Sequence, residues 1–273
     1  MWTDAGVRGA LSYDAAVSGV RDWQAVFDQT FSMPVSSVEE RIRREVFGDE
    51  YPEGLGTNSL LSRTELKRFV QEVRVAQDEE LADIGCGRGG PGLWVTAKTG
   101  AHLTGLDISR AALDVASVRA QALGLADRCT WREGSFEATG LDQGSVDAVM
   151  SVDALLFTPD KAAAARELAR ILRPGGRLVL TTWDYHAQPQ GRPPQVPDHR
   201  PVLHTAGFNM LAYEETVDWR QRQLQLVDGL IAAVDDMAAE TGEDRDEVEA
   251  ELREMRGTNA TMIARRLIVA ERR

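Results

Sequence analysis

Short apolar runs alternate with longer segments of helical periodicity through the middle of the chain. Each run has the length of a buried strand, and between the runs apolar residues recur every three or four positions, as on one face of a helix. The run at 145–151 is rich in Val and carries one charge, which is typical of a strand inside a parallel sheet. The pattern predicts one large α/β domain. Strands are expected at 80–84, 101–107, 128–133, 145–151, 177–182, 208–217 and 266–270, with helices at 63–73, 93–99, 110–123 and 160–172.

The segments on either side of this core are predicted to be helical. Helical spacing recurs near the start of the chain and again after Ser36 or Ser37, either of which would cap a helix. Residues 219–255 are periodic with long acidic stretches, which usually indicate a solvated face. The proline-rich loop at 188–201 is expected at the mouth of a pocket. We expect an N-terminal helical cap at 1–72, a core at 73–218 and 264–273, and a helical insertion at 219–263 that forms a lid or an oligomer surface.

The first strand ends in an acidic residue followed by a glycine-dense loop, and residues 83–92 read DIGCGRGGPG. Glycines let a ligand lie against the main chain, and the helix behind the loop directs free N–H groups toward that ligand. The spacing satisfies both G-x-G-x-x-G, the dinucleotide fingerprint, and G-x-G-x-G. The carboxylate of Asp83 would repel a pyrophosphate, whereas S-adenosylmethionine carries a cationic sulfonium and an ammonium group. The acid therefore favours S-adenosylmethionine.

A second carboxylate lies one strand–helix–strand unit further on. Asp107 ends the second predicted strand, where a carboxylate can accept hydrogen bonds from both hydroxyls of a ribose. This contact serves NAD and S-adenosylmethionine alike, so it indicates a nucleoside without choosing between them. The alternative is that Asp107 caps the following helix, although Ser109 fits that role better.

Four stretches of the chain resemble the successive motifs of class I S-adenosylmethionine-dependent methyltransferases. They are 83–89, 107–109, 146–149 and 172–176, and the resemblance covers about 73–184. Within that family, the sequence most resembles bacterial methyltransferases that act on small molecules of natural-product or quinone type. The resemblance implies a Rossmann-like, doubly wound sheet of seven strands with an antiparallel last strand. It also implies S-adenosyl-L-methionine as cofactor, S-adenosyl-L-homocysteine as product, and N-terminal helices that fold over the cofactor. Candidate pocket residues in those helices are Tyr13, Met33, Tyr51 and Leu60.

The resemblance also assigns cofactor-binding residues. Gly134 is often followed by an acid in the family, which bonds the adenine amino group, whereas this chain has Ser135, a weaker acceptor. Phe136 can pack on the adenine face, and Ser151 is expected near the methionine half. Cys86 is interpreted as a small loop residue rather than a nucleophile. The expected set is Asp83, Gly85, Cys86, Gly87, Gly89, Asp107, Ile108, Gly134, Ser135, Phe136 and Ser151.

Methyl transfer from a sulfonium is an in-line displacement, so the protein's main tasks are alignment and exclusion of water. No metal is expected, because the four histidines show no ligand spacing. A phenol or alcohol acceptor would profit from a general base. His199, on the loop, and Asp153, after the fourth strand, are the first candidates. Asp153 could equally contact the substrate, cap a helix or bond the backbone. Oxygen is slightly favoured over nitrogen or carbon as the acceptor atom.

Other function classes stay open. A protein of the same fold can keep the cofactor and catalyse a different reaction, such as a cyclisation, because fold does not fix chemistry. It can also be a binding or regulatory protein without activity, although a proline-rich loop and capping helices favour an enclosed pocket. A dehydrogenase is the weakest alternative, since the second half of the chain offers no further nucleotide loop.

Composition narrows the partners. The 273 residues carry a net charge of −12 without a Lys/Arg-rich block, which argues against nucleic acid or an anionic membrane surface as partner. No apolar run reaches membrane-spanning length and no secretory signal is recognised. The two cysteines are expected to be reduced thiols of a cytoplasmic protein. A small-molecule substrate, as in secondary-metabolite or antibiotic biosynthesis, and a possible homo-oligomer complete the prediction.

Overall fold

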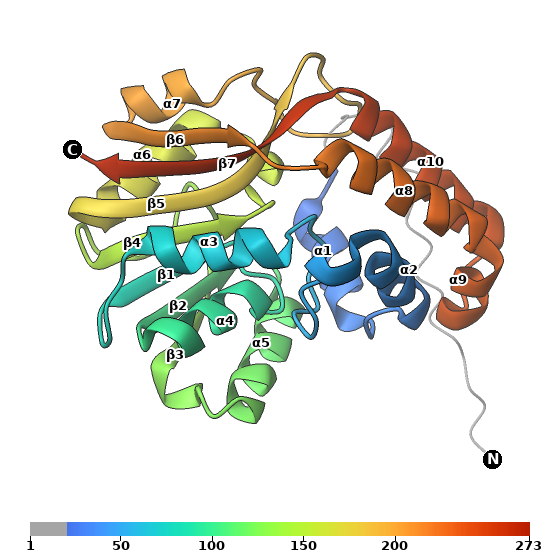
Figure 1. Cartoon of the computed structure of the whole chain (residues 1–273), viewed down its shortest axis with the longest axis horizontal. Coiled ribbons are helices and arrows are strands. Elements are labelled where there is room, and N and C mark those ends of the chain that lie inside the picture. Colours follow the sequence, from blue (N-terminus) through green and yellow to red (C-terminus); the bar gives the residue numbers. More distant parts are fainter. Residues whose placement is uncertain (1–20) are drawn as a thin grey trace.

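The computed structural model describes residues 21–273, which form a seven-stranded sheet flanked by helices (Figure 1). The strand order is β3-β2-β1-β4-β5-β7-β6, and β7 runs antiparallel to both of its neighbours while the other pairings are parallel. The order reverses between β1 and β4, which makes the carboxyl ends of these two strands the switch point of the sheet. The strands are β1 (Glu80–Ile84), β2 (His102–Asp107), β3 (Cys129–Glu133), β4 (Val146–Val152), β5 (Leu172–Tyr185), β6 (Phe208–Glu215) and β7 (Met262–Arg272). The predicted fold class is confirmed.

Helices cover both faces of the sheet and bury its apolar side chains in two separate cores. One core contains buried side chains of α3 (Arg63–Val73), α4 (Gly90–Thr99) and α5 (Arg110–Ala122) against β1, β2 and β4. The other contains α6 (Lys161–Ile171) and α7 (Arg200–Thr205) against the opposite face. The central strands are therefore apolar on both sides, as their sequences predict.

Local signals in the sequence set where several helices begin. Ser36, rather than Ser37, caps α2 (Ser37–Phe47) by accepting from the backbone N–H of Glu39. Ser62 and Glu65 form a reciprocal capping box at the start of α3. Asp160 accepts from two backbone N–H groups at the start of α6. These caps position the helices whose ends face the carboxyl edge of the sheet.

A further helical layer lies beside the carboxyl edge and joins two segments that are far apart in sequence (Figure 1). Helices α1 (Trp23–Ser32) and α2 (Ser37–Phe47) come from the N-terminal part, and α8 (Trp219–Ala232), α9 (Val234–Thr241) and α10 (Arg245–Ala260) come from the insertion. Ile42 of α2 packs so closely against Gly229 of α8 that a Cβ there would lie 2.7 Å from its side chain. The predicted cap and the predicted insertion thus share one apolar core, which also includes the ends of β5 and β7.

Several element boundaries differ from the prediction. The acidic stretch after residue 218 is three helices, and Gly242, at a φ of 75°, ends α9 before α10 begins. Strand β5 begins at Leu172, earlier than expected, because Leu172 pairs with Val146 of β4. Strand β7 begins early at Met262 because its antiparallel pairing continues to Tyr185 at the end of β5. The periodicity of one segment cannot reveal which distant strand it pairs with.

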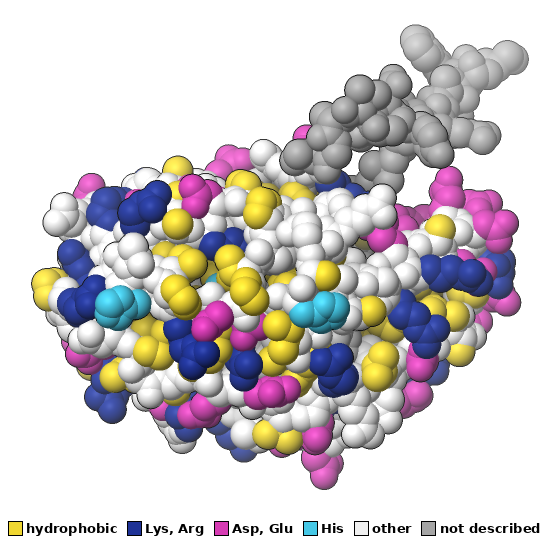
Figure 2. Space-filling model, turned by 90° about the horizontal axis from the view of Figure 1, so that it is seen from above, with side chains coloured by type: hydrophobic (Ala, Val, Ile, Leu, Met, Phe, Trp, Pro, Cys, Tyr) yellow, Lys and Arg dark blue, Asp and Glu magenta, His cyan; other side chains and the backbone are white. Residues whose placement is uncertain are grey.

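Acidic and basic side chains are interspersed on the face shown in Figure 2. Among residues 21–273, no helix combines the length and apolar character that a bilayer crossing requires.

Candidate functional site

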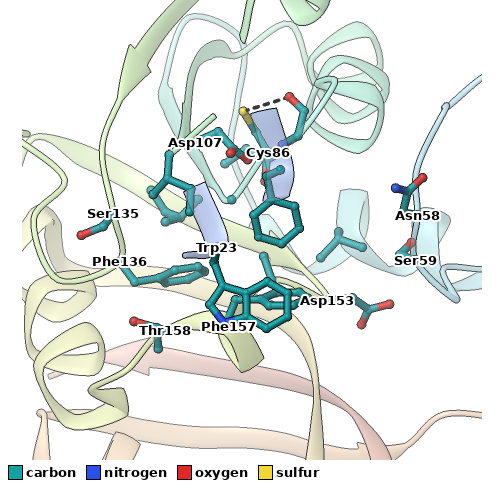
Figure 3. A pocket seen from close by; sticks show the side chains of 18 of the residues that line it. Trp23, Asn58, Ser59, Cys86, Asp107, Ser135, Phe136, Asp153, Phe157 and Thr158 are labelled. Carbon is teal, nitrogen blue, oxygen red and sulfur yellow. Dashed lines mark hydrogen bonds between the residues drawn. The ribbon is translucent and has the colours of Figure 1, made fainter. Parts of the chain in front are cut away.

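A cavity of about 490 Å³ opens at the switch point of the sheet, a volume typical of small-molecule sites (Figure 3). Its floor is the glycine loop after β1 and the ends of β2 and β4. Its other walls come from α1, from the segment before α3, and from the proline-rich loop. The lining residues belong to 21–31, 55–59, 83–91, 107–108, 134–137, 152–159 and 191–194. None of them comes from the insertion at 219–263, which instead supports α2.

The glycine loop turns sharply because its glycines adopt backbone angles that side chains disfavour. Gly85 and Gly87 have φ values of 71° and 52°. The backbone N–H groups of Gly85 and Cys86 donate to the carbonyl of Leu106, at 2.8 and 3.0 Å, which ties the loop to β2. A Cβ on Gly90 would lie 2.0 Å from the carbonyl oxygen of Leu55. The start of α4 and the 55–59 wall therefore fit together only with glycine there.

Two buried carboxylates lie beneath this loop. Asp83 is 2% exposed and Asp107 is 7% exposed. Burial, reinforced by the charge of Asp107, raises the pKa of Asp83 to about 7. Burial also raises the pKa of Asp107, against hydrogen bonds from the backbone N–H groups of Ser109 and Gly87 at 2.9 and 2.8 Å. Neither acid has a salt-bridge partner within residues 21–273. The site holds negative charge that a cationic ligand would neutralise.

The other predicted cofactor residues divide into two groups. Most of them line the cavity, and Figure 3 shows Asp107, Ser135 and Phe136 on one side of it and Asn58 and Ser59 on the other. Gly89 and Ser151 do not line it. Gly89 faces Trp131, and Ser151 is fully buried within β4. The predicted residues that the structure brings together are Asp83, Gly85, Cys86, Gly87, Asp107, Ile108, Gly134, Ser135 and Phe136.

Cys86 has the surroundings of a structural thiol. It is buried, and its Sγ lies 3.7 Å from the carbonyl oxygen of Gly87. Burial, with the nearby charges of Asp83 and Asp107, raises the pKa of the thiol well above its ordinary value. A thiol that stays protonated is a poor nucleophile, as its interpretation as a loop residue requires.

Asp153 lines the cavity but is bound to an arginine. Its φ is 53°, and both carboxylate oxygens accept from the guanidinium of Arg265 at 3.0 to 3.2 Å. The backbone N–H of Leu60 donates to the same carboxylate at 3.1 Å. Because donors already occupy both oxygens, Asp153 is not free to take a proton from a substrate. Of the alternatives left by the sequence, the structure shows a backbone bond, together with an ion pair that sequence spacing did not reveal.

His199 does not reach the cavity. It is 1% exposed, and its Nδ1 lies 3.1 Å from Oδ1 of Asp184. Tyr213 and Arg266 also donate to this carboxylate, at 2.6 and 2.7 Å, and Tyr213 accepts from the backbone N–H of His199. This network fastens the end of the proline-rich loop to β5, β6 and β7. We therefore do not retain His199 as a candidate base, although residues 191–194 of its loop line the cavity as expected.

The sequence analysis missed the aromatic wall contributed by α1. The rings of Trp23 and Phe27 each lie 4.8 Å from the ring of Phe157, and Phe31 continues the row. Helical spacing predicted this helix but not which of its faces meets the cavity. Arg192 was missed as well, because one arginine in a proline-rich loop gives no sequence signal. Of the earlier pocket candidates, Met33, Tyr51 and Leu60 do not line this cavity, and Tyr13 lies outside the described residues.

Two contacts fasten α1 over the glycine loop. Arg88 of the loop donates to the carbonyls of Thr30 and Met33, at 3.2 and 2.8 Å. Ser109, at the start of α5, donates to Asp28 at 2.7 Å. The residues that follow β1 and β2 thus form part of the cavity floor and also fix the position of α1, which forms one wall of the cavity. Within 21–273, no cluster of three or more His, Cys, Asp or Glu side chains is arranged to hold a metal ion.

Comparison with known proteins agrees with this arrangement. Residues 82–180 match a family described as methyltransferase domain. Methyltransferase GfsG from Streptomyces halstedii is 33% identical over 114 residues, which make up 42% of this chain and 41% of the relative. The chain spans less than half the length of the curated relatives it matches.

Two solved structures share the fold over most of the chain. The cyclase SpnF has a TM-score of 0.70 at 22% identity, with 93% of this chain and 97% of that one covered. Geranyl diphosphate C-methyltransferase from Streptomyces coelicolor, crystallised with S-adenosyl-L-homocysteine, has a TM-score of 0.65 at 18% identity, with 94% of this chain and all of that one covered. Residues 82–180 are therefore similar to a methyltransferase domain, in agreement with the family motifs that the sequence resembles there, and the two solved structures share the fold.

Proposed function

We propose that the chain transfers a methyl group from S-adenosylmethionine to a small organic acceptor, with oxygen as the favoured acceptor atom. One observation carries the proposal: Asp83 and Asp107 are buried without a cationic partner within 21–273, beneath a glycine loop that opens into an apolar cavity. A ligand that bears two cationic groups and a ribose matches this combination of charge and acceptors.

The lining residues suggest how the cofactor is held. Asp107 accepts from the ribose hydroxyls, Ser135 and Phe136 contact the adenine, and the main chain at 85–87 lies against the methionine half. Ile108 and Gly134 complete the nucleoside wall. Gly89 and Ser151, which do not line the cavity, act indirectly through the shape of the loop and of β4. In this proposal residues 73–218 and 264–273 form the cofactor-binding core, and 21–72 with 219–263 form the cap, while the first 20 residues of the expected cap lie outside the described residues.

The surroundings of the two candidate bases shape the proposed chemistry: His199 does not line the cavity, and Asp153 is bound to Arg265. The bound cofactor supplies an activated methyl group on sulfur. The residues of the chain orient the acceptor and exclude water, which is the task of the aromatic wall formed by Trp23, Phe27 and Phe157. Asp153 is occupied by Arg265, so the acceptor oxygen is one that ionises by itself, as in a phenol or an enol.

The proposal is tested in two steps. Isothermal titration should show binding of S-adenosylmethionine and none of NADH, and the reverse result would overturn the assignment of the cofactor. A mass-spectrometric screen of phenolic and enolic natural-product-like acceptors should then show a gain of one methyl group together with S-adenosylhomocysteine. Methylation only of carbon or nitrogen acceptors would contradict the preference for oxygen.

A cofactor-dependent cyclase is the second candidate. A cavity with an aromatic wall, in which the candidate base Asp153 is bound to Arg265, also suits a pericyclic or cyclisation reaction, which needs a shaped apolar site. Turnover of a substrate without any S-adenosylhomocysteine would favour this candidate, whereas equal amounts of methylated product and S-adenosylhomocysteine would exclude it for that substrate.

A further inference from the structure

Arg192, from the proline-rich loop, lies in the cavity wall against two aromatic rings. Its guanidinium carbon is 4.6 Å from the ring centre of Trp23 and 4.9 Å from that of Phe157. Trp23 belongs to α1 and Phe157 follows β4, so three separate segments meet here. Cation–π contacts with both rings hold the planar group in place and leave its N–H edges available to a hydrogen-bond acceptor.

The donors of this guanidinium have no acceptor in the described part of the chain. Nε and Nη1 of Arg192 are buried, and neither has a hydrogen-bond partner within residues 21–273. Burial lowers the pKa of Arg192, and the like charge of Arg21 lowers it further. The charge of Glu254 acts in the opposite direction and raises the pKa of Arg192, but Glu254 is itself paired with Arg21 at 3.1 Å. A buried cation with unmet donors is costly unless a ligand supplies the acceptor.

A second polar group without a partner among the described residues lies near Arg192 but outside the lining of the cavity, and a flat apolar surface lies within that lining. The hydroxyl of Tyr185 is buried without a partner among the described residues, and Tyr185 lies close enough to Arg192 for that charge to lower its pKa against the effect of burial. Trp23 and Phe157 face the cavity across from Cys86 and the glycine loop (Figure 3). The basic group therefore stands at the wall opposite the acids that are proposed to hold the cofactor.

We propose that Arg192 recognises an anionic oxygen group of the acceptor, whose flat apolar part packs on Trp23 and Phe157. This inference rests on the proposed function and narrows its substrate class to acceptors with a carboxylate or an ionised hydroxyl. The charge of such a group meets the free N–H donors, and its ring occupies the aromatic wall. In methyl transfer to an ionised hydroxyl, Arg192 positions the reacting oxygen and favours its ionised form.

The test uses the full chain saturated with S-adenosylhomocysteine, so that the cofactor's own carboxylate is already accommodated. Isothermal titration compares 2-naphthoate with 2-naphthamide, a pair that differs in charge but little in shape. We expect the carboxylate to bind more tightly, and Arg192→Gln to weaken it about ten- to a hundredfold while naphthamide changes less than about twofold. Equal binding of the two probes, or a carboxylate preference that survives in Arg192→Gln, would overturn the inference.

Two controls separate a contact with the acceptor from a general effect of losing a guanidinium and from an effect on the cofactor. Arg222→Gln removes a guanidinium that also stacks on an aromatic ring, 5.2 Å from Phe47, but lies outside the cavity, so it should change neither probe. The affinity for S-adenosylhomocysteine reports on folding and on the cofactor site. If Arg192→Gln lost that affinity, Arg192 would serve the cofactor and the inference would be wrong. If the wild-type chain bound no S-adenosylhomocysteine, the proposed function itself would fail.

A second readout distinguishes an ionised hydroxyl from a carboxylate. Nitrophenol changes colour when it ionises, so its absorbance reports its charge while bound. If an ionised hydroxyl is the natural group, the apparent pKa of bound 4-nitrophenol should fall in the wild-type complex and return to its free value in Arg192→Gln. A carboxylate preference without any such shift assigns the site to carboxylates, and absence of both effects contradicts the inference.

Discussion

Asp83 and Asp153 are both buried at the carboxyl ends of neighbouring strands, yet their charges are met differently. Asp153 is neutralised by the guanidinium of Arg265. Asp83 has the charge of Asp107 nearby and no cation among residues 21–273. An acid left in this state is available to a positive ligand, whereas a paired acid acts as structure. Burial alone therefore does not distinguish the two residues. Asp83 is proposed to bind the ligand because it lacks a cationic partner among the described residues, and Asp153 is structural because it has one.

The buried network around His199 yields a prediction about catalysis. His199→Ala removes the hydrogen bond to Asp184, so it should lower the free energy of unfolding by about 1–3 kcal/mol. The rate of methyl transfer per folded molecule, and its pH profile, should stay within about twofold of wild type because a removed base would cost about a hundredfold or more. Thermal melts and initial rates measure the two effects. His204→Ala, in the helix α7 that follows His199, is the control. A hundredfold loss of rate at unchanged stability would restore His199 as the base.

Part of the charge distribution in the site could be predicted from the residues in the sequence. The acid before the glycines predicted the charge of the site, because that signal lies within one strand and one turn. The pairing of Asp153 with Arg265 could not be predicted, since the two are 112 positions apart and meet only when β4 and β7 are placed in one sheet. Arg192 was missed because one arginine in a proline-rich loop gives no sequence signal.

At the scale of elements, the start of α4 is limited by the close approach of the segment before α3. Gly90→Ala would place a Cβ against the carbonyl of Leu55 and force the cavity wall outward. We expect an affinity for S-adenosylmethionine at least about tenfold weaker, since a displacement of about 1 Å can have effects of that size or more. Titration calorimetry measures it.

Gly257→Ala is the matched control for that substitution. Gly257 lies within α10, and a Cβ added there would have no heavy atom within 4 Å, so alanine fits. It should raise stability by up to about 1 kcal/mol through helix propensity and leave cofactor affinity unchanged. Wild-type affinity in Gly90→Ala would contradict the proposed fit between α4 and the wall.

Element type was predictable wherever one segment contained the signal. Strand β1 and helix α3 lie where periodicity predicts them. The face that α1 turns to the cavity was not predictable, because all its aromatic residues have the same apolar character. Contacts from Arg88 and Ser109 fix that orientation, and both residues come from segments much later in the chain.

At the scale of the whole molecule, Arg265 joins the core to the cap. This fully buried residue of β7 binds Asp153 after β4, Glu65 in α3 and Thr216 after β6. Its removal would leave Asp153 and Glu65 unpaired in a buried place. Arg265→Met should therefore lower the free energy of unfolding by about 3–5 kcal/mol.

Urea unfolding measures that loss, and Arg253→Met is its control. Arg253 pairs with Glu249 on the exposed face of α10, so its removal should change stability by less than about 1 kcal/mol. Equal losses of unfolding free energy in Arg265→Met and Arg253→Met would show that the buried ion pairs of Arg265 do not stabilise the contact between core and cap.

The sheet and its switch point were predictable, since they depend on motifs confined to about 73–184. The helical layer was not, because α2 and α8 share a core only through long-range packing. The proposed acceptor binds at the aromatic wall, which includes α1 of this helical layer. The acceptor class is therefore inferred from Arg192 and the aromatic wall, and not from the sequence motifs.

The central claim is that an ionised Asp83 attracts a cationic cofactor, and the affinity for S-adenosylmethionine as a function of pH tests it most directly. The pKa of Asp83 in the ligand-free protein is about 7, so a cation meets a charged partner above that pH and a protonated one below it. We predict that the wild-type affinity falls as the pH drops below 7, by up to about tenfold per unit, and that Asp83→Asn binds weakly with little pH dependence. Wild-type affinity that does not change between about pH 5.5 and 7.5, or tight binding by Asp83→Asn, would contradict the account.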